Sequence, residues 1–395
     1  MLSLEEAQRR LLARASIAGE EQVELRAAGG RALADPRIVA PLDVPPFANS
    51  AMDGFAMRAS DTPGALRISG EVAAGRRDLP TVSVGEAVRI TTGAPLPPGA
   101  DTVVPLEEAD EVDGAVTVPR SAEGTFVRPA GSDTRAGTEL CLPGMLGPVQ
   151  VAVLASLGFA RVRVRRRPRV AVLSTGDELV EAGQELEPGQ IYDSNGPALE
   201  AAIAEAGGEP HSVGRVGDRR EDVEEALRAG ATFDLVVSSG GVSVGQHDHV
   251  RDVLEAAGSL DFWRIAVQPG KPLAVGELDG VTVIGLPGNP VSALVTFELF
   301  ARPMIRAMLG LSGDGRLHVR ARPREAIAKD STRRAFLRVA MWNEAGEMLA
   351  RPAGGQGSAQ LRPLAEANAF LVVPEGEEVA DPSRTYDAIV YGALV

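Results

Sequence analysis

The apolar positions between residues 169 and 311 come in short runs that alternate with amphipathic segments. The runs VAVLS, HSVGRV and DLVVSS have the length and apolar content of buried strands. Each is followed along the chain by a segment with helical spacing, namely PALEAAIAEA, REDVEEALRAG and VRDVLEAAG. Three more apolar runs, FWRIAV, LAVGEL and VTVIGL, precede a long helix that begins at Pro290. Alternating strands and helices predict a doubly wound parallel sheet with right-handed crossovers.

Two other regions carry the pattern of β structure. Residues 64–140 consist of short β-branched runs divided by Gly and Pro, and no long helix fits them. Residues 312–395 contain the runs LHVRARP, RAFLRVAMW, LARPAG, AFLVVPEG and YDAIVYGALV. A small barrel or sandwich of about five strands fits this second pattern.

Helical spacing returns on both sides of the first β region. Residues 1–16 are a charged amphipathic segment with a capping box from Ser3 to Glu6, and residues 143–160 carry an apolar face. The β region is therefore predicted to be an insertion into a discontinuous first domain. The expected fold class is multidomain α/β plus β: a doubly wound parallel-sheet domain, an inserted β domain and a C-terminal β-barrel. The expected domains are residues 1–45 with 135–168, 46–134, 169–311 and 312–395.

Composition narrows the class of protein further. A chain of 395 residues is too long for one ordinary core, which agrees with several domains. A net charge of −14 argues against a general nucleic-acid binder, although residues 161–169 form a basic run that we interpret as an exposed connector. The single cysteine, Cys141, excludes an internal disulfide. No apolar run reaches membrane length, so we expect a cytoplasmic protein without a membrane partner.

A proline-stiffened loop follows residue 40. Its sequence is APLDVPPFANSAMDGFAMRASD, in which the prolines disfavour both helix and strand. The loop displays Ser50, Met52, Asp53 and Gly54. Two interpretations stay open at this point, a functional loop and a rigid interdomain linker.

The stretch FDLVVSSGGVSVGQHDHV, residues 233–250, changes from an apolar strand to a Gly/Ser loop before a helix. Such a loop lets backbone N–H groups approach an anion closely, although the same pattern also occurs in turns without a ligand. The candidate ligand-binding residues of this loop are Ser239, Gly240, Gly241, Ser243 and Gly245. His247 and His249 flank Asp248, but the hard divalent ions of phosphate chemistry prefer carboxylate oxygens to imidazole.

Polar and small residues follow the other predicted strands as well. Ligands in open α/β sheets bind outside the carboxyl ends of the strands, so these residues are predicted to converge on one crevice. Asp177, Glu178 and Asp248 are the predicted Mg²⁺ ligands, and the glycine loops and Lys271 suit a phosphate. Caps and turns would explain individual members but not their presence in every loop. The remaining candidates are Thr175, Gly176, Asp193, Ser194, Asn195, Asp218, Pro287, Gly288, Asn289 and Pro290.

The combination of motifs resembles the molybdopterin molybdotransferases, the family of the bacterial molybdenum insertase and the gephyrin E domain. The motifs are PPFANSAMDGFA, RITTGAP, STGDEL, DSN, SSGGVSVGQHD, QPGKP and LPGNPVSA, in the family's order along the whole chain. There is no GxxxxGK[ST] and no GxGxxG, so neither the P-loop nor the Rossmann fingerprint applies. The resemblance implies the four domains given above, with the molybdopterin-binding domain at residues 169–311.

The resemblance also implies an activity. The enzyme would take adenylylated molybdopterin and molybdate, hydrolyse the adenylate with Mg²⁺, release AMP and insert molybdenum into the dithiolene. Arg338 and Ser358 look like the family's molybdate-binding pair, and Lys271, Pro287 and Pro290 match its substrate-side loops. Gln268 stands where some members carry lysine. The positions whose side chains matter in the family correspond to Asp53, Thr92, Asp133, Glu178, Asp218 and Asp248.

The family works as a homodimer in which the second domain of one subunit reaches the third domain of the other. A molybdopterin adenylyltransferase and apo-molybdoenzymes are the partner proteins that the resemblance suggests. Three alternatives remain: a molybdopterin adenylyltransferase, another nucleotide pyrophosphate hydrolase, and a non-enzymatic scaffold of the gephyrin kind. The extra domains and the PPFANSAMDG loop disfavour the first two, and the complete set of acidic residues disfavours the scaffold.

Overall fold

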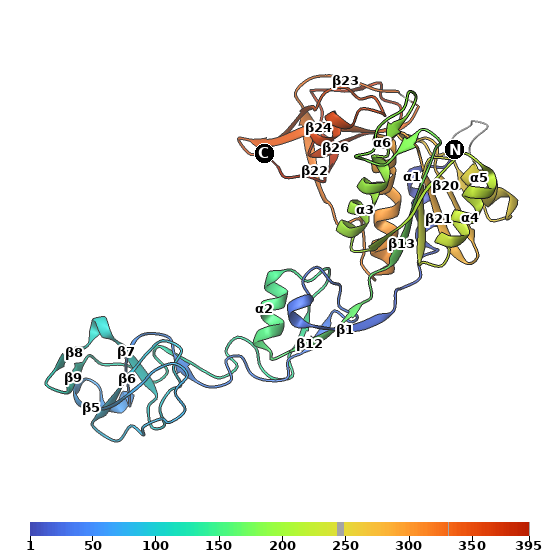
Figure 1. Cartoon of the computed structure of the whole chain (residues 1–395). Coiled ribbons are helices and arrows are strands. Elements are labelled where there is room, and N and C mark those ends of the chain that lie inside the picture. The colour runs from blue at the N-terminus through green and yellow to red at the C-terminus, as the bar shows by residue number, and fades with distance from the viewer. Residues whose placement is uncertain (243–248, 331, 395) are drawn as a thin grey trace. The chain divides into compact units, whose positions relative to one another are not determined.

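The structure, a computed structural model, describes residues 1–242, 249–330 and 332–394 (Figure 1). It divides into a larger unit, Met1–Glu21 with Arg165–Val395, and a smaller unit, Gln22–Val164. Each unit is described by itself. The finer domain boundaries given above stay predictions.

The larger unit contains a six-stranded sheet with helices on both faces. Its four consecutive strands β16, β13, β17 and β21 are parallel, which confirms the doubly wound core of the prediction. Strands β20 and β18 are antiparallel, so the sheet is mixed. In order across the sheet, the strands are β16 (Glu209–Val216), β13 (Arg169–Thr175), β17 (Leu235–Ser239), β21 (Val281–Leu286), β20 (Ala274–Leu278) and β18 (Phe262–Trp263).

The antiparallel strand β20 is a detail that the predicted doubly wound parallel sheet did not contain. Asp279 and Gly280 form the two-residue turn between β20 and β21, and both have positive φ, at 51° and 83°. An Asp-Gly pair in this conformation makes a tight hairpin, whereas a parallel connection needs a long crossover. The segment FWRIAV is likewise divided, because Arg264 has a positive φ of 79° and ends β18.

Alternate residues of the central strands face opposite layers. Val170 and Val172 of β13 belong to a core with α1, α3 and the helical segment from α6 to α7. Ala171 and Leu173 pack with α4 and α5, which lie on the other side of β13 from α3 in Figure 1. The helices are α1 (Leu4–Leu12), α3 (Asn195–Ala206), α4 (Arg220–Gly230), α5 (His249–Ala256), α6 (Pro290–Thr296), the π-helix η4 (Phe297–Ala301) and α7 (Arg302–Met308).

Helix α1 packs on the α/β layer. Ser3 caps it as predicted, since its hydroxyl accepts the N–H of Glu6 at 3.2 Å. Leu4, Ala7 and Leu11 are buried in the core beside the sheet. The first residues of the chain are thus part of the larger unit, although residues 22–45 and 135–164 of the predicted first domain lie in the smaller one.

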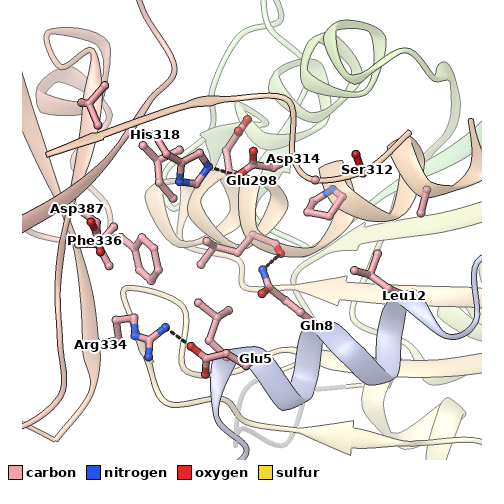
Figure 2. Close-up of a pocket in the computed structure, with 18 of the residues that line it drawn as sticks. Glu5, Gln8, Leu12, Glu298, Ser312, Asp314, His318, Arg334, Phe336 and Asp387 are labelled. Atoms are coloured by element: carbon pink, nitrogen blue, oxygen red, sulfur yellow. Dashed lines mark hydrogen bonds and ion pairs between the residues drawn. The ribbon is translucent and has the colours of Figure 1, made fainter. Parts of the chain in front are cut away.

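The predicted long helix after Pro290 contains a π turn. Pro303 has no N–H to donate to the carbonyl of Leu299, one helical turn earlier. The Nε2 of Gln8 donates to that carbonyl at 2.8 Å instead, as Figure 2 shows. A π turn at this place lets the helix continue past the proline while α1 satisfies the freed acceptor.

The C-terminal part of the larger unit is a β-barrel, as predicted. Strand β24 pairs with both β25 and β26, which closes the sheet, and Leu337, Val339 and Leu371 fill the interior. The barrel strands are β22 (Leu317–Pro323), β24 (Arg334–Glu344), β25 (Glu347–Pro352), β26 (Ala369–Val373) and β28 (Tyr386–Val390), with β19 (Val267–Gln268) added beside β24. Short elements of this unit are β14 (Leu179–Val180), β15 (Ile191–Tyr192), β23 (Ile327–Ala328), β27 (Val379–Ala380) and α8 (Leu361–Ala365).

The smaller unit is mainly β structure with one helix, α2 (Pro148–Ser156). Its sheet has the order β7 (Thr102–Pro105), β4 (Gly54–Met57), β6 (Glu86–Ile90), β5 (Gly64–Val72), β9 (Ala115–Val118) and β8 (Asp110–Val112). Two-stranded pairs join β2 (Arg37–Val39) to β11 (Glu139–Cys141), β3 (Asn49–Ser50) to β10 (Val127–Arg128), and β1 (Glu20–Glu24) to β12 (Arg161–Arg165). Single 3₁₀ turns are η1 (Leu25–Ala27), η2 (Ala59–Asp61) and η3 (Leu106–Glu108). None of the described helices in either unit has the length and apolar character needed to cross a membrane.

An ion-pair network joins α3, η4 and the segment that leads into the barrel. Arg316 donates to Glu205 at 2.7 Å and to Glu298 at 2.8 Å, and Arg302 donates to Glu205 at 2.7 Å. Burial alone lowers the pKa of Arg316, but the hydrogen bonds that it donates to the two carboxylates outweigh burial and raise the pKa. The same contacts lower the pKa of Glu205 although burial opposes them.

Arg316→Met is expected to lower the free energy of unfolding of the larger unit by about 2–4 kcal/mol, because Glu298, whose side chain is only 11% exposed, loses a charged partner. Arg228→Met, at an exposed pair, should cost less than about 1 kcal/mol. The pKa of Glu205 lies below its ordinary value of 4.5 in the folded state. Its contribution is therefore complete at neutral pH and is lost as the pH falls through the lowered value. Urea unfolding of the wild type and the two variants at pH 7 and at low pH measures these changes in the free energy of unfolding. If Arg316→Met lowered the free energy of unfolding equally at the two pH values, the predicted role of ionised Glu205 would be contradicted.

Candidate functional site

A crevice lies outside the carboxyl ends of β13, β17 and β21. After β13 the chain continues to β16, which lies on one side of β13 in the sheet. It then crosses to β17 on the other side of β13. The loops after β13 and β17 therefore run in opposite directions, and the crevice lies between them. The crevice has a volume of about 260 Å³. It is lined by Thr175, Gly176, Glu178, Asp218, Gly240, Gly241, Val242, Pro272, Pro287, Gly288 and Asn289. The structure thus brings together most of the predicted strand-end loops, and Ser243, Gly245 and Asp248 lie outside the described residues.

A larger groove of about 800 Å³ lies elsewhere in the same unit, among α1, α7 and the barrel (Figure 2). Its floor is apolar. At its rim, Arg334 forms an ion pair with Glu5 at 2.5 Å, and Nε2 of His318 lies 2.9 Å from a carboxylate oxygen of Asp314. None of the predicted site residues is among the described residues that line it. The larger cavity of this unit is therefore not the one at the strand ends.

Gly240 lets the crevice loops approach each other, and Gly288 lies next to it. Gly240 has a φ of 97°, and a Cβ there would lie 2.5 Å from Oγ1 and 2.9 Å from the backbone oxygen of Thr175. A Cβ on Gly288 would lie 3.7 Å from Cα of Gly240. A side chain at residue 240 would therefore separate the loops after β13 and β17.

Gly240→Ala is expected to destabilise the protein by roughly 3 kcal/mol, through left-handed backbone and a clash with backbone atoms of Thr175. Gly214→Ala is the matched control, because Gly214 has a φ of 107° and nothing within 4 Å of the added Cβ. The control should cost only about 1 kcal/mol. Thermal unfolding of both variants measures the difference, and equal costs would show that the loop contact is not restrictive.

Some hydrogen-bonding groups of the Gly/Ser loop already have partners within the chain. The N–H of Gly240 donates to the carbonyl of Leu286 at 3.0 Å, so it is not free for a phosphate. The hydroxyl of Ser239 is buried and accepts the amide of Asn195 at 2.7 Å. The N–H of Gly240 and the hydroxyl of Ser239 thus support the shape of the loop, whereas the predicted role of the other backbone donors of the loop stays a prediction.

Two carboxylates face the crevice. Glu178 folds over Gly176, since a Cβ on that glycine would lie 2.5 Å from Oε2 of Glu178. Asp218 lines the crevice from the loop after β16. Asp177 does not line it; its Oδ1 accepts the N–H of Asp218 at 3.0 Å. Asp177 therefore positions Asp218, and the described residues contain no group of three or more potential metal ligands.

The segment after β15 starts helix α3. Oδ1 of Asp193 accepts the N–H groups of Asn195 and Gly196, both at 3.0 Å. Ser194 is the N-cap residue without a side-chain cap bond. The amide of Asn195 donates to Ser239 and to the carbonyl of Gly288, both at 2.7 Å. The side chains of Asp193 and Asn195 therefore have structural partners within the chain.

The QPGKP segment contributes to the crevice through its last proline. Pro272 lines the crevice, whereas the side chain of Lys271 is exposed and is not among the described lining residues. The carbonyl of Lys271 accepts the N–H of Ile265 at 3.0 Å. Gln268 accepts the N–H of Asp330 at 3.2 Å. Pro290 is the first residue of α6.

The predicted site residues of the smaller unit include one hydrogen-bonded pair. Oδ1 of Asp53 accepts the N–H of Thr92 at 2.6 Å, and this bond is the main cause that lowers the pKa of Asp53. Asp133 is exposed, and its N–H donates to the carbonyl of Val44 at 3.0 Å. Asp53 therefore stays ionised and oriented at neutral pH.

Arg338 of β24 is a buried arginine with unused donors. Its Nη2 donates to the carbonyl of Gly355 at 2.6 Å, while Nε and Nη1 have no hydrogen-bond partner among the described residues. Burial lowers the pKa of its guanidinium. Unpaired buried donors on a cation are costly, and an oxyanion would satisfy them.

Ser358 links the loop beside Arg338 to the crevice. Its hydroxyl accepts the amide of Asn289 at 3.1 Å, and its carbonyl accepts the N–H of Val291 at 3.1 Å. Gln356 accepts the N–H of Arg338 and donates to its carbonyl, both at 3.0 Å. The barrel loop thus touches the turn that lines the crevice. Sequence reasoning did not single out Gln356, Val242 or Pro272, although Pro272 stands in the QPGKP motif.

Comparisons with known proteins agree over the whole chain. Residues 2–158 match the MoeA N-terminal region (domain I and II), residues 171–307 a probable molybdopterin binding domain, and residues 320–389 the MoeA C-terminal region (domain IV). A molybdopterin molybdenumtransferase 2 of Mycobacterium tuberculosis is 39% identical over 354 residues, covering 86% of this chain and 87% of the relative. The chain belongs to the MoeA family of molybdopterin molybdenumtransferases.

Further MoeA relatives extend the match. The molybdopterin molybdenumtransferase of Haemophilus influenzae is 37% identical over 396 residues and covers 95% of each chain. Two crystal structures of a molybdopterin biosynthesis MoeA protein from Pyrococcus horikoshii have a TM-score of 0.84, at 35% and 30% identity, and cover at least 99% of this chain and 100% of their own. The MoeA fold and the family resemblance inferred from the sequence motifs are therefore confirmed.

Proposed function

We propose that this chain hydrolyses the adenylate of adenylylated molybdopterin, releases AMP and inserts molybdenum from molybdate into the dithiolene. Its membership of the molybdopterin molybdenumtransferases of molybdenum cofactor biosynthesis supports the overall reaction. One structural observation carries the proposal further, namely the contact of Ser358 with Asn289. It connects the loop of an arginine suited to an oxyanion with the crevice suited to a phosphate.

The crevice is proposed to hold the phosphate bridge of the substrate. Small residues at 240, 241 and 288 let the bridge approach the backbone. Glu178 and Asp218 supply the hard oxygen atoms that Mg²⁺ prefers, with Asp248 as the further expected ligand. When bound there, Mg²⁺ would neutralise charge on the phosphates during cleavage of the anhydride bond.

Molybdate is proposed to lie at Arg338 and Ser358. The guanidinium nitrogens Nε and Nη1, which have no partner among the described residues, and the serine hydroxyl are suitable donors for its oxygen atoms. An oxygen of molybdate attacks the pterin-side phosphorus, the P–O bond to the adenylate breaks, and AMP leaves with the bridging oxygen. The two dithiolene sulfurs then replace oxygen ligands of molybdenum, which leave as water with the thiol protons, and hydrolysis of the P–O–Mo link frees the pterin phosphate. Asp177 keeps Asp218 in place through the hydrogen bond from the N–H of residue 218.

The proposed test follows AMP. The purified chain is incubated with adenylylated molybdopterin and Mg²⁺, with and without molybdate. We expect AMP release that depends on molybdate and is lost when Mg²⁺ is chelated. Bound substrate without molybdate-dependent AMP release would overturn the proposal.

We further propose that the active form is a homodimer in which Asp53, Thr92 and Asp133 of one subunit complete the crevice of the other. Asp53→Asn and Glu178→Gln should each be inactive alone. When the two variants are mixed so that subunits exchange, about a quarter of the sites regain both wild-type residues, and activity should rise to about that fraction. No recovery in a mixture shown to contain mixed dimers would place both residues in one subunit's site.

A further inference from the structure

The amide of Asn195 has no donor left for a ligand. Its Nδ2 lies 2.7 Å from Oγ of Ser239 and 2.7 Å from the carbonyl of Gly288. A carbonyl oxygen only accepts, so the atom facing Gly288 is the nitrogen, and its two hydrogens are used by these two bonds. The remaining amide oxygen is an acceptor and would repel a phosphate. Asn195 therefore stands at the crevice without being suited to hold the anion, contrary to its interpretation as a ligand-binding residue.

The two acceptors belong to different walls of the crevice. Ser239 ends strand β17, while Gly288 lies in the turn of residues 287–290 that follows β21. Asn195 itself opens α3, on the other side of β13. One side chain thus fastens three separate chain segments at the place where their loops meet.

The fastened turn continues to the barrel. Asn289 donates to the hydroxyl of Ser358, and the N–H of Val291 donates to its carbonyl, each at 3.1 Å. Within the same loop, Gln356 and Gly355 bond to Arg338. Hydrogen bonds and a short stretch of backbone therefore form a continuous path from the crevice wall to the buried guanidinium.

We propose that Asn195 is a positioning residue that couples the two substrate sites through the turn of residues 287–290. When the pterin substrate fills the crevice, the turn of residues 287–290 is held against Asn195. The ordered turn then orders residues 354–360 beside Arg338. The pterin substrate thus prepares the oxyanion site before molybdate binds. This inference rests on the proposed function, because it takes the crevice and Arg338 as the two substrate sites.

Hydrogen exchange of the full chain, measured by mass spectrometry with molybdopterin as the probe, tests the coupling. In the wild type, molybdopterin should slow exchange both at residues 239–242 and at residues 354–360, by about fivefold or more, the lower end of ordinary coupling. In Asn195→Ala, the slowing at residues 239–242 should persist and that at residues 354–360 should disappear. Asn289→Ala, an exposed position, removes the next bond of the path and should give the same selective loss.

Asn343→Ala is the matched control. Asn343 is an exposed asparagine whose side-chain oxygen accepts the N–H of Gly346 in a barrel hairpin, so both responses should be kept. If Asn195 is merely structural, exchange in Asn195→Ala will be faster at residues 239–242 and 354–360 without ligand, and molybdopterin will still slow exchange at both segments. That result would overturn the coupling. Loss of molybdopterin binding in Asn195→Ala at an unchanged melting temperature would make it a direct ligand and also overturn it. No response anywhere in the wild type would overturn the proposed crevice itself.

Discussion

Glu178→Gln is expected to lower molybdate-dependent AMP release by about 10²–10³-fold, because the crevice loses one of its two described carboxylates where the phosphate charge must be neutralised. Glu178 is exposed and makes no ion pair among the described residues. The free energy of unfolding should therefore change by no more than about 0.5 kcal/mol. Steady-state assays of AMP release together with thermal unfolding measure the two effects.

Glu187→Gln is the matched control for this prediction. Glu187 is an exposed carboxylate on the loop that lines a neighbouring cavity with Asp177. Its replacement removes the same charge a short distance along the chain and should leave AMP release unchanged. Equal losses in both variants would mean that general negative charge, and not the position of Glu178, sets the rate.

Arg338→Met is expected to weaken molybdate binding at least about 100-fold, because two charge-assisted hydrogen bonds worth about 1.5–3 kcal/mol each are lost. The same change should leave the melting temperature unchanged or raise it. Nε and Nη1 of this buried cation have no partner among the described residues, so its burial in the free protein is a cost that methionine removes.

Arg302→Met gives the contrast. Arg302 is almost as deeply buried, but it pairs with Glu205 at 2.7 Å and with Glu298 at 2.9 Å. Its loss should lower the melting temperature and leave molybdate binding in place. Titration calorimetry with molybdate and thermal unfolding distinguish the two variants. An Arg338→Met protein that is as destabilised as Arg302→Met and still binds molybdate would show that Arg338 is only structural.

The layer structure of the larger unit was predictable because it depends on periodicity. Strands such as β13 (Arg169–Thr175) carry apolar residues on both faces, and the segments between them have helical spacing. The strand ends of a parallel sheet share one edge, so the motif residues Glu178, Asp218 and Gly240 had to converge. The antiparallel β20 could also have been read from Asp279-Gly280, a known hairpin signal.

The partners of individual side chains were not predictable in the same way. Asp177, Ser239 and Asn195 have the residue types of ligands, but each is bonded to another part of the chain. The contact between Asn289 and Ser358 joins positions 69 apart in the sequence, and no local pattern encodes it. Residue type predicts which chemistry is available, whereas the tertiary fold decides which donors and acceptors remain free.

The central claim is that this chain inserts molybdenum into the pterin dithiolene and cleaves the adenylate in the same reaction. The direct measurement is to incubate the protein with adenylylated molybdopterin, Mg²⁺ and molybdate, separate the pterin product, and quantify molybdenum on the pterin beside the AMP released. The account predicts that molybdenum and AMP appear in equal amounts with the wild type, and that neither forms with Glu178→Gln. AMP release that leaves the pterin free of molybdenum would contradict the account.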